Sequence, residues 1–292
     1  MLSGCDNFCT YCAIPYIRGR FESRKFEDII DEAKELAEKG FEEIIVIAQD
    51  TTKYGIDLYG KYRLPELLRE LCRIDGIRWV RFLYAYPESI TDELLDVVAE
   101  EEKICNYFDI PIQHFSDRIL KKMNRKTNGM QIRDVVQRIR RRIPDCILRT
   151  SLIVGFPGET EDDFEVLKEA VSELKFDRLG CFAYSKEDGT PAADFENQVH
   201  SKTKEKRRRI IMELQRKISE EKLMSKVGEV FDVLLEGVSD DGLFLIGRSY
   251  MDCPDTDGVI YVGGAGDELI GKFVEVRVVG VEGYDLVGEC LI

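Results

Sequence analysis

Three of the nine cysteines in this 292-residue chain, Cys5, Cys9 and Cys12, fall within eight residues of one another. Thiolates at this spacing on one loop suit a soft metal ion or an iron–sulfur cluster. A structural zinc site normally takes four protein ligands, and neither a second Cys-x-x-Cys nor a nearby histidine supplies the fourth. Three thiolates on a four-iron cluster leave one iron open for chemistry. We therefore favour an iron–sulfur cluster, with a zinc site or a redox pair as the alternative.

The other six cysteines are isolated, and most have apolar neighbours. We interpret them as small buried hydrophobic side chains, because free cysteine is among the most buried residue types. They are Cys72, Cys105, Cys146, Cys181, Cys253 and Cys290. No signal-peptide core and no membrane-spanning apolar run is present, so we expect a cytoplasmic protein whose thiols stay reduced. The two histidines make His-based hydrolase chemistry a poor interpretation.

The elements that must position the cysteine loop alternate between helix and strand. Helical spacing of apolar residues predicts helices over 27–39, 64–73, 91–102, 116–123, 130–143 and 161–174. Apolar runs predict strands over 43–48, 79–85, 106–112, 147–154 and 178–184. This alternation predicts an α/β fold with a parallel sheet or barrel. A sixth strand would normally precede the cysteine loop, so we expect that the chain begins late.

Polar and special residues gather where the predicted strands end, and the carboxyl edge of a parallel sheet is where ligands bind. We expect five of these residues to line a cofactor and substrate cavity: Gln49, Asp50, Gln113, His114 and Gly155. For His114, a satisfied structural histidine is an equal alternative. Gly155 could serve a tight turn, a close backbone approach to a cofactor, or both.

The composition changes near residue 200. A charged segment over 202–226 has apolar residues at helical spacing and predicts a connecting helix. Its basic run, 204–209, is interpreted as a solvated face, with nucleic-acid contact as the alternative. Short strands are then predicted over 230–235, 242–247, 258–262, 273–279 and 286–291. Five short strands in about 65 residues favour a small closed barrel of OB-like kind.

The negative charge is concentrated in that C-terminal region. The whole chain carries −14, and residues 223–292 alone hold four basic and fourteen acidic residues, a net −10. Such a barrel would repel RNA phosphates. Charge complementarity predicts a basic partner instead, such as a ribosomal protein, with improved solubility as the alternative role of the charge.

The spacing Cys-x-x-x-Cys-x-x-Cys, with the aromatic Tyr11 before the last cysteine, resembles the signature of radical S-adenosylmethionine enzymes. The resemblance implies that Cys5, Cys9 and Cys12 are catalytic and hold a [4Fe–4S] cluster, whose open iron chelates S-adenosyl-L-methionine. One electron cleaves the sulfonium to give a 5′-deoxyadenosyl radical. The resemblance also implies a partial (βα)6 barrel, with Tyr11 packed beside the adenine.

Within that superfamily the chain resembles methylthiotransferases along nearly its full length. The resemblance rests on 18–20 with 23–24, on 154–160, and on a C-terminal barrel that looks like a TRAM domain. It implies three parts: a radical SAM core over 1–200, a connecting helix over 201–226 and a TRAM domain over 227–292. Further motifs, 49–55, 84–87, 111–114 and 247–258, look like the branch that modifies an aspartate of the small-subunit ribosomal protein S-twelve.

The implied activity adds a methylthio group to the β-carbon of that aspartate. The family uses a second [4Fe–4S] cluster on an N-terminal domain. We expect that domain to be missing here, and therefore expect cleavage of S-adenosylmethionine without full turnover. A reductant protein is an implied partner, whereas membrane association is not expected. Two alternatives remain open: a methylthiotransferase acting on isopentenyladenosine in tRNA, and a non-catalytic ribosome adaptor with a structural zinc.

Overall fold

The computed structural model describes residues 1–291, and the chain forms two compact units. The first unit comprises Met1–Leu174 with Leu179–Met212, and the second comprises Lys175–Arg178 with the residues from Glu213 onward. The predicted connecting helix is α9, Ser201–Met224, and the boundary between the units falls inside it.

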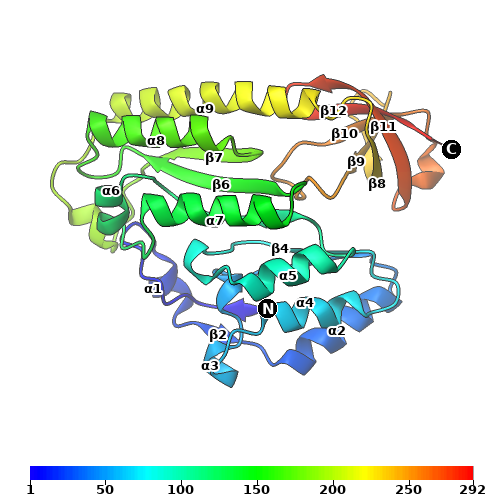
Figure 1. Ribbon diagram of the computed structural model, residues 1–292, viewed down its shortest axis with the longest axis horizontal. Coiled ribbons are helices and arrows are strands. Elements are labelled where there is room, and N and C mark those ends of the chain that lie inside the picture. The colour runs from blue at the N-terminus through cyan, green and yellow to red at the C-terminus, as the bar shows by residue number, and fades with distance from the viewer. Residues whose placement is uncertain (292) are drawn as a thin grey trace. The chain divides into compact units, whose positions relative to one another are not determined.

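Five parallel strands form the sheet of the first unit, each followed by helix or loop (Figure 1). The strands are β3 (Glu43–Val46), β4 (Trp79–Phe82), β5 (Tyr107–Asp109), β6 (Ile147–Val154) and β7 (Arg178–Ala183). They pair as β3–β4 and as β5–β6–β7. A parallel bridge between Val80 and Ile104, just before β5, and a hydrogen bond from Ala85 N to Asp109 O link the two groups. A short antiparallel pair, β1 (Leu2–Ser3) with β2 (Glu22–Ser23), flanks the cysteine loop. The predicted α/β architecture is confirmed.

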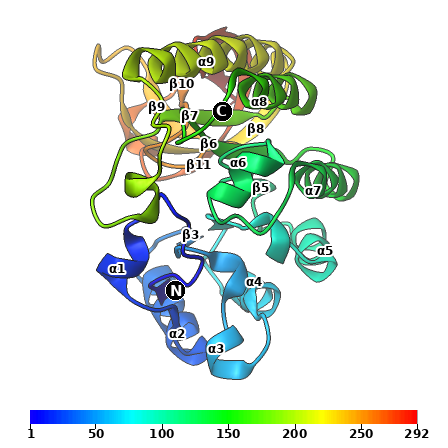
Figure 2. The same ribbon diagram turned by 90° about the vertical axis from the view of Figure 1, so that its left-hand side faces the viewer.

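Helices cover the outer side of this sheet, and in Figure 2 α2, α4, α5, α7 and α8 form an arc around β3, β5, β6 and β7. Their bounds are α1 (Ile14–Arg18), α2 (Phe26–Glu38), α3 (Ile56–Tyr59), α4 (Leu64–Cys72), α5 (Asp92–Glu100), α6 (Asp117–Lys122), α7 (Gly129–Arg142) and α8 (Glu161–Leu174). Capping residues in the sequence determine where α5 and α7 begin. Thr91 caps α5 by accepting a hydrogen bond from Leu94 N at 3.2 Å, and Asn128 with Gln131 forms a capping box on α7.

Strands β3, β4 and β5 end earlier than their apolar runs predict. In the segments that follow β4 and β5, Tyr84 and Gln113 adopt left-handed backbone conformations, with φ of 60° and 76°, which turn the chain out of the strand direction. The residues past these points form loops at the carboxyl edge of the sheet. Short 3-10 turns occupy two of the loops, η1 (Thr51–Lys53) and η2 (Pro87–Ser89), and a third, η3 (Pro191–Asp194), lies after β7.

The second unit contains a closed five-stranded barrel with strand order β10-β12-β11-β8-β9, as the sequence predicts. The strands are β8 (Val230–Val238), β9 (Leu245–Arg248), β10 (Ile260–Gly263), β11 (Phe273–Glu282) and β12 (Asp285–Cys290), with the turn η4 (Asp267–Leu269) before β11. The barrel closes through the parallel pair β10–β12. Closure removes free strand edges.

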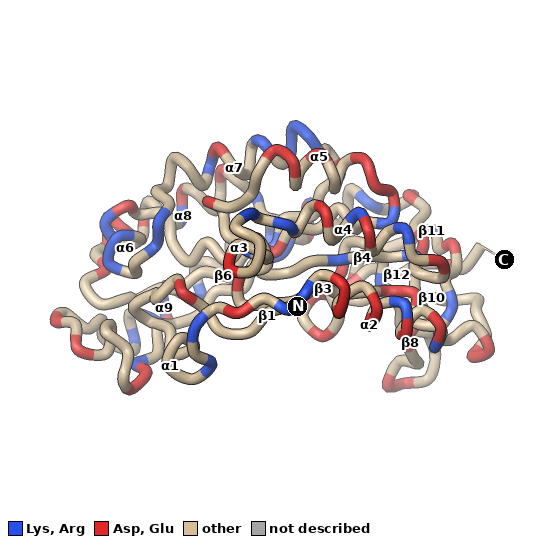
Figure 3. Tube along the Cα trace, turned by 90° about the horizontal axis from the view of Figure 1, so that it is seen from below, with Lys and Arg blue, Asp and Glu red and all other residues tan. Residues whose placement is uncertain are grey.

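The charge pattern differs along the chain. In Figure 3, α6 and α7 carry many basic residues, whereas acidic residues predominate along the barrel segments near β8 and β10. Within residues 1–291, no helix has the length and apolar character needed to cross a membrane.

Candidate functional site

The carboxyl ends of the strands in the first unit lie next to one another in sheet order. Thr51 N donates to Tyr84 O at 3.2 Å, and Ala85 N donates to Asp109 O at 2.8 Å. Gln113 N donates to Ser151 O at 2.9 Å, so the loop after β5 adjoins β6. The polar loops that the sequence analysis singled out therefore form one continuous edge, as expected for parallel strands.

The cysteine loop is fixed by contacts with segments that are distant in sequence. Asn124 Nδ2 donates to Phe8 O at 2.9 Å, and Thr10 N donates to Met123 O at 3.1 Å. At the other end of the loop, Cys5 N donates to Gly19 O at 3.2 Å. These bonds hold the loop against the end of α6.

A close approach at the start of the loop requires glycine. Gly4 has φ of +68°, and a Cβ there would lie 1.9 Å from Arg20 O. Phe8, the residue just before Cys9, also has a left-handed backbone, with φ of 47°. The loop that presents the three thiols is thus conformationally constrained.

A buried polar cluster joins the cysteine loop to the end of β3. Asp50, 1% exposed, accepts hydrogen bonds from Asn7 Nδ2 at 3.1 Å and from Thr52 Oγ1 at 2.5 Å. Lys53 Nζ lies 3.1 Å from Asp50 Oδ2 and also bonds the Asn7 side chain. The predicted site residue Asp50 therefore acts through Asn7 on the loop itself, whereas Gln49 next to it is exposed.

A buried guanidinium lies beside the central cysteine. Arg125 is 8% exposed, and its Nη1 is 3.9 Å from Cys9 Sγ. Its Nη2 donates to Pro111 O at 2.9 Å, and its guanidinium carbon lies 4.3 Å from the centre of the Tyr86 ring. A fixed positive charge at this position favours any anionic group bound there.

Tyr11 packs against a buried apolar cluster that includes Met123, Phe156 and Tyr184. Burial raises the pKa of Tyr11 well above its usual range, and the adjacent Cys9 adds to this shift. The hydroxyl therefore stays protonated and can donate to sulfur. Tyr11 is accordingly positioned at the cysteine loop.

His114 lies deeper than the other predicted site residues, with 0% exposure. Its Nδ1 accepts a hydrogen bond from Ser116 N at 2.9 Å, and its Nε2 faces Glu159 Oε2 at 3.5 Å. Glu159 Oε2 also accepts from Gly155 N at 2.8 Å, and its Oε1 accepts from Arg207 at 2.7 Å. His114 and Gly155 thus meet through one buried carboxylate, that of Glu159.

Arg207 corrects the interpretation of the basic run 204–209 as a solvated face. This side chain is 5% exposed and bonds Glu159 and Glu161. The sequence contained a usable signal: Arg207 precedes the buried Ile211 by four residues and so lies on the apolar stripe of α9. Arg125 carried no comparable signal, because the helical and turn residues around it show no chemical motif.

The donor set fits an iron–sulfur cluster. Cys5, Cys9 and Cys12 are free thiols, and the first two are buried. Burial raises the pKa of the Cys5 and Cys12 thiols, so binding of a metal would displace their protons. Within residues 1–291, no three His, Cys, Asp or Glu side chains are arranged to hold a single metal ion.

Two family models match the chain. The model described as the radical SAM superfamily matches residues 1–171, and the model described as the TRAM domain matches residues 227–291. The first match covers the cysteine loop and strands β3 to β6, and the second covers the closed barrel.

The chain is similar to curated proteins described as ribosomal protein uS12 methylthiotransferase RimO. The protein from Alkaliphilus oremlandii is 61% identical over 98% of this chain and 66% of its own length. Those from Acetivibrio thermocellus and Clostridioides difficile are each 53% identical over 99% of this chain. The chain spans 64% and 65% of the length of these two relatives.

Solved structures share the fold at low sequence identity. A radical S-adenosylmethionine methyltransferase, TsrM from Kitasatospora setae, matches with a TM-score of 0.55 at 18% identity, over 66% of this chain and 37% of that chain. Coproporphyrinogen III oxidase from Escherichia coli matches with a TM-score of 0.51 at 17% identity, over 94% of this chain and 64% of that chain.

Proposed function

Since the chain belongs to the radical SAM superfamily and carries a TRAM domain, we propose that it is the catalytic core of a methylthiotransferase acting on ribosomal protein uS12. The superfamily implies a [4Fe–4S] cluster and S-adenosylmethionine. One observation carries the specific proposal: 61% identity over 287 residues to a curated uS12 methylthiotransferase. The reaction replaces a hydrogen on the β-carbon of an aspartate by a methylthio group.

We assign Cys5, Cys9 and Cys12 as the cluster ligands. When bound, the cluster supplies the electron that cleaves S-adenosylmethionine and so provides the radical for hydrogen abstraction. Arg125 places a positive charge beside the Cys9 sulfur and offsets negative charge bound at the loop. Asp50 orients Asn7 and thereby the backbone between Cys5 and Cys9. These groups act by positioning the ligands and by excluding water from the two buried thiols.

The other predicted site residues have different roles in this proposal. Tyr11 and Gln113 border the cofactor, and exposed Gln49 contacts substrate. His114 is fully buried, so it acts through Glu159 on the Gly155 turn. That turn presents backbone groups toward the cofactor.

The acidic barrel supplies the contact with the substrate protein. Residues 223–292 carry a net −10, which complements a basic ribosomal protein and repels tRNA phosphates. A substrate of this kind places the protein in the cytoplasm. A second [4Fe–4S] cluster, on the part of the relatives' length that this chain does not span, and a reductant protein complete the proposed system.

The test is direct. The chain is reconstituted anaerobically with iron and sulfide, reduced, and incubated with S-adenosylmethionine and purified uS12, with and without the remaining third of a relative such as the Alkaliphilus protein. We expect 5′-deoxyadenosine in both reactions and methylthiolated aspartate, detected by mass spectrometry, only in the complemented one. Zinc in place of iron and sulfide, or modification of tRNA instead of uS12, would refute the proposal.

A further inference from the structure

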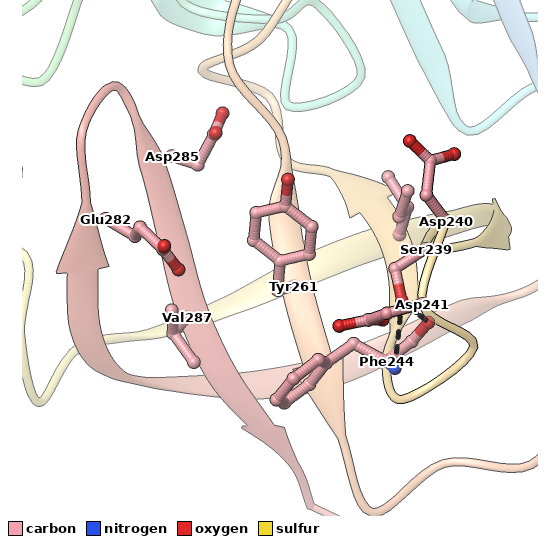
Figure 4. Close-up of a pocket in the computed structure, with 9 residues that line it drawn as sticks. Ser239, Asp240, Asp241, Phe244, Tyr261, Glu282, Asp285 and Val287 are labelled. Atoms are coloured by element: carbon pink, nitrogen blue, oxygen red, sulfur yellow. Dashed lines mark hydrogen bonds between the residues drawn. The ribbon is translucent and has the colours of Figure 1, made fainter.

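A cavity of about 400 Å³ lies on the surface of the barrel, between the β8–β9 and β11–β12 turns (Figure 4). Its floor comes from one face of three neighbouring strands. Tyr261 on β10 is in register with Ile246 on β9 and with Val287 on β12. The floor therefore has an apolar surface with one hydroxyl.

An aromatic pair forms part of the wall. The rings of Phe244 and Tyr261 lie 6.3 Å apart between centroids, with an interplanar angle of 69°. The backbone of Phe244 is fixed because its N donates to Ser239 Oγ at 3.1 Å and its O accepts from Ser239 N at 2.9 Å. Aromatic rings held rigidly in an open cavity bind flat or cationic groups at low entropic cost.

Four carboxylates surround these rings. Asp240 and Asp241 come from the β8–β9 turn, and Glu282 and Asp285 come from the β11–β12 turn. Figure 4 shows the Tyr261 ring between the two pairs. In the described part of the chain, residues 1–291, no lysine or arginine lies within ion-pair distance of any of the four.

The turns hold two of these carboxylates in place. Asp241 Oδ1 accepts from Ser239 Oγ at 2.6 Å and from Leu243 N at 3.0 Å. Asp285 Oδ1 accepts from Val259 N at 2.8 Å. The pKa of Tyr261 is raised, chiefly by Asp285 and also by burial and the other three acids. The negative charges of all four carboxylates therefore act on the Tyr261 ring at the centre of the cavity.

We infer that this cavity binds an arginine side chain from a basic segment of the substrate protein. A guanidinium stacks on Tyr261 or Phe244 and pairs with carboxylates from both turns, which a compact ammonium cannot do equally well. A phosphate group is repelled by all four acids. The cavity and its preference for arginine follow from the structure of the barrel alone. The identity of the protein that supplies the arginine rests on the proposed function.

The test compares two charge-matched double variants of the whole 292-residue chain. The first, Asp240→Asn with Glu282→Gln, neutralises two cavity acids that have no internal partner. The second, Asp267→Asn with Glu275→Gln, removes the same charge at exposed barrel positions outside the cavity. Binding of uS12, an oligoarginine peptide and an oligolysine peptide of equal length is measured by calorimetry at constant ionic strength. Tyr261→Leu and Tyr261→Phe test the ring.

We expect the cavity double variant to weaken uS12 and oligoarginine binding by about tenfold and the control variant by less than about threefold. Tyr261→Leu should weaken the binding of both ligands by about fivefold. Tyr261→Phe keeps the aromatic ring and should not weaken it. Equal losses in the two double variants, or equal affinities for the two peptides, would overturn the inference. If oligoarginine shows the predicted pattern and uS12 does not bind, the result supports arginine binding in the cavity and refutes uS12 as the substrate.

Discussion

The residues that distinguish the site are a buried guanidinium and a buried carboxylate on either side of the cysteine loop. Arg125 approaches Cys9 to 3.9 Å, and Asp50 holds Asn7 at 3.1 Å. Both side chains are buried, with 8% and 1% exposure, so each is held in a fixed direction. Charged groups of this kind tune bound metal centres without ligating them.

Removal of one thiol should eliminate the cluster. We expect Cys5→Ala, Cys9→Ala and Cys12→Ala to abolish the brown absorbance after anaerobic reconstitution and the formation of 5′-deoxyadenosine. Cys290→Ser, a partly exposed thiol on β12, is the control and should retain both. Full iron and sulfide content in any of the three alanine variants would contradict the assignment.

Loss of the guanidinium should affect reactivity more than assembly. We expect Arg125→Gln to lower the rate of S-adenosylmethionine cleavage by about 10- to 100-fold and to change the electron paramagnetic resonance spectrum of the reduced cluster. Arg125→Lys keeps the charge and should recover part of the rate. An unchanged spectrum and rate in Arg125→Gln would show that the contact with Cys9 is only structural.

At the level of elements, ion pairs of two buried carboxylates, Glu159 and Asp163, fix the loops that follow the strands. Glu159 joins the Gly155 turn to α9 through Arg207, and Asp163 at the start of α8 joins it to α6 through Ser116 and Arg118. These pairs connect elements that the strands alone do not hold together. The carboxyl edge of the sheet is therefore rigid where the site needs it.

The Asp163 contacts should make stability depend on pH. Burial alone would raise the pKa of Asp163, but hydrogen bonds from Arg118, Ser116 and Thr160 more than offset this and hold the pKa far below 3.8. The unfolded chain takes up this proton near pH 3.8 and the folded chain only at lower pH. The contribution of Asp163 is therefore complete above about pH 5 and is lost as the pH falls below about 4.

Urea unfolding of the iron-free chain between pH 3 and pH 7 measures this effect. We expect Asp163→Asn to lower the free energy of unfolding by about 1–3 kcal/mol at pH 7 and to flatten its acid slope. Asp162→Asn, an exposed neighbour, is the control and should change neither quantity. An unaltered acid slope in Asp163→Asn would assign the pH dependence to other carboxyls.

At the level of the whole molecule, the three clustered cysteines and most of the negative charge lie in different parts of the chain. The three cysteines belong to the first unit, whereas −10 of the total −14 lies in residues 223–292. A domain with this charge attracts a basic protein over distances of about a Debye length.

This long-range attraction should respond to salt. We expect the affinity of the chain for uS12 to fall by at least about tenfold between 50 and 300 mM salt, because screening weakens the interaction of exposed charges. Calorimetric titrations at several salt concentrations measure the slope. The control variant Asp267→Asn with Glu275→Gln should reduce the slope, and an affinity independent of salt would argue against electrostatic recognition.

The sequence by itself predicted the cysteine ligands, and it determined the order of strands and helices, the closed barrel and its charge. Strand β6 and helix α8 have the predicted bounds, because hydrophobic periodicity and capping are local signals. Only the tertiary structure decided which polar residues support the cysteine loop. Arg125 is 116 residues from Cys9, and Arg207 is 48 residues from Glu159. Such pairs form only when packing excludes water from both partners, and no local pattern encodes which distant segments will meet.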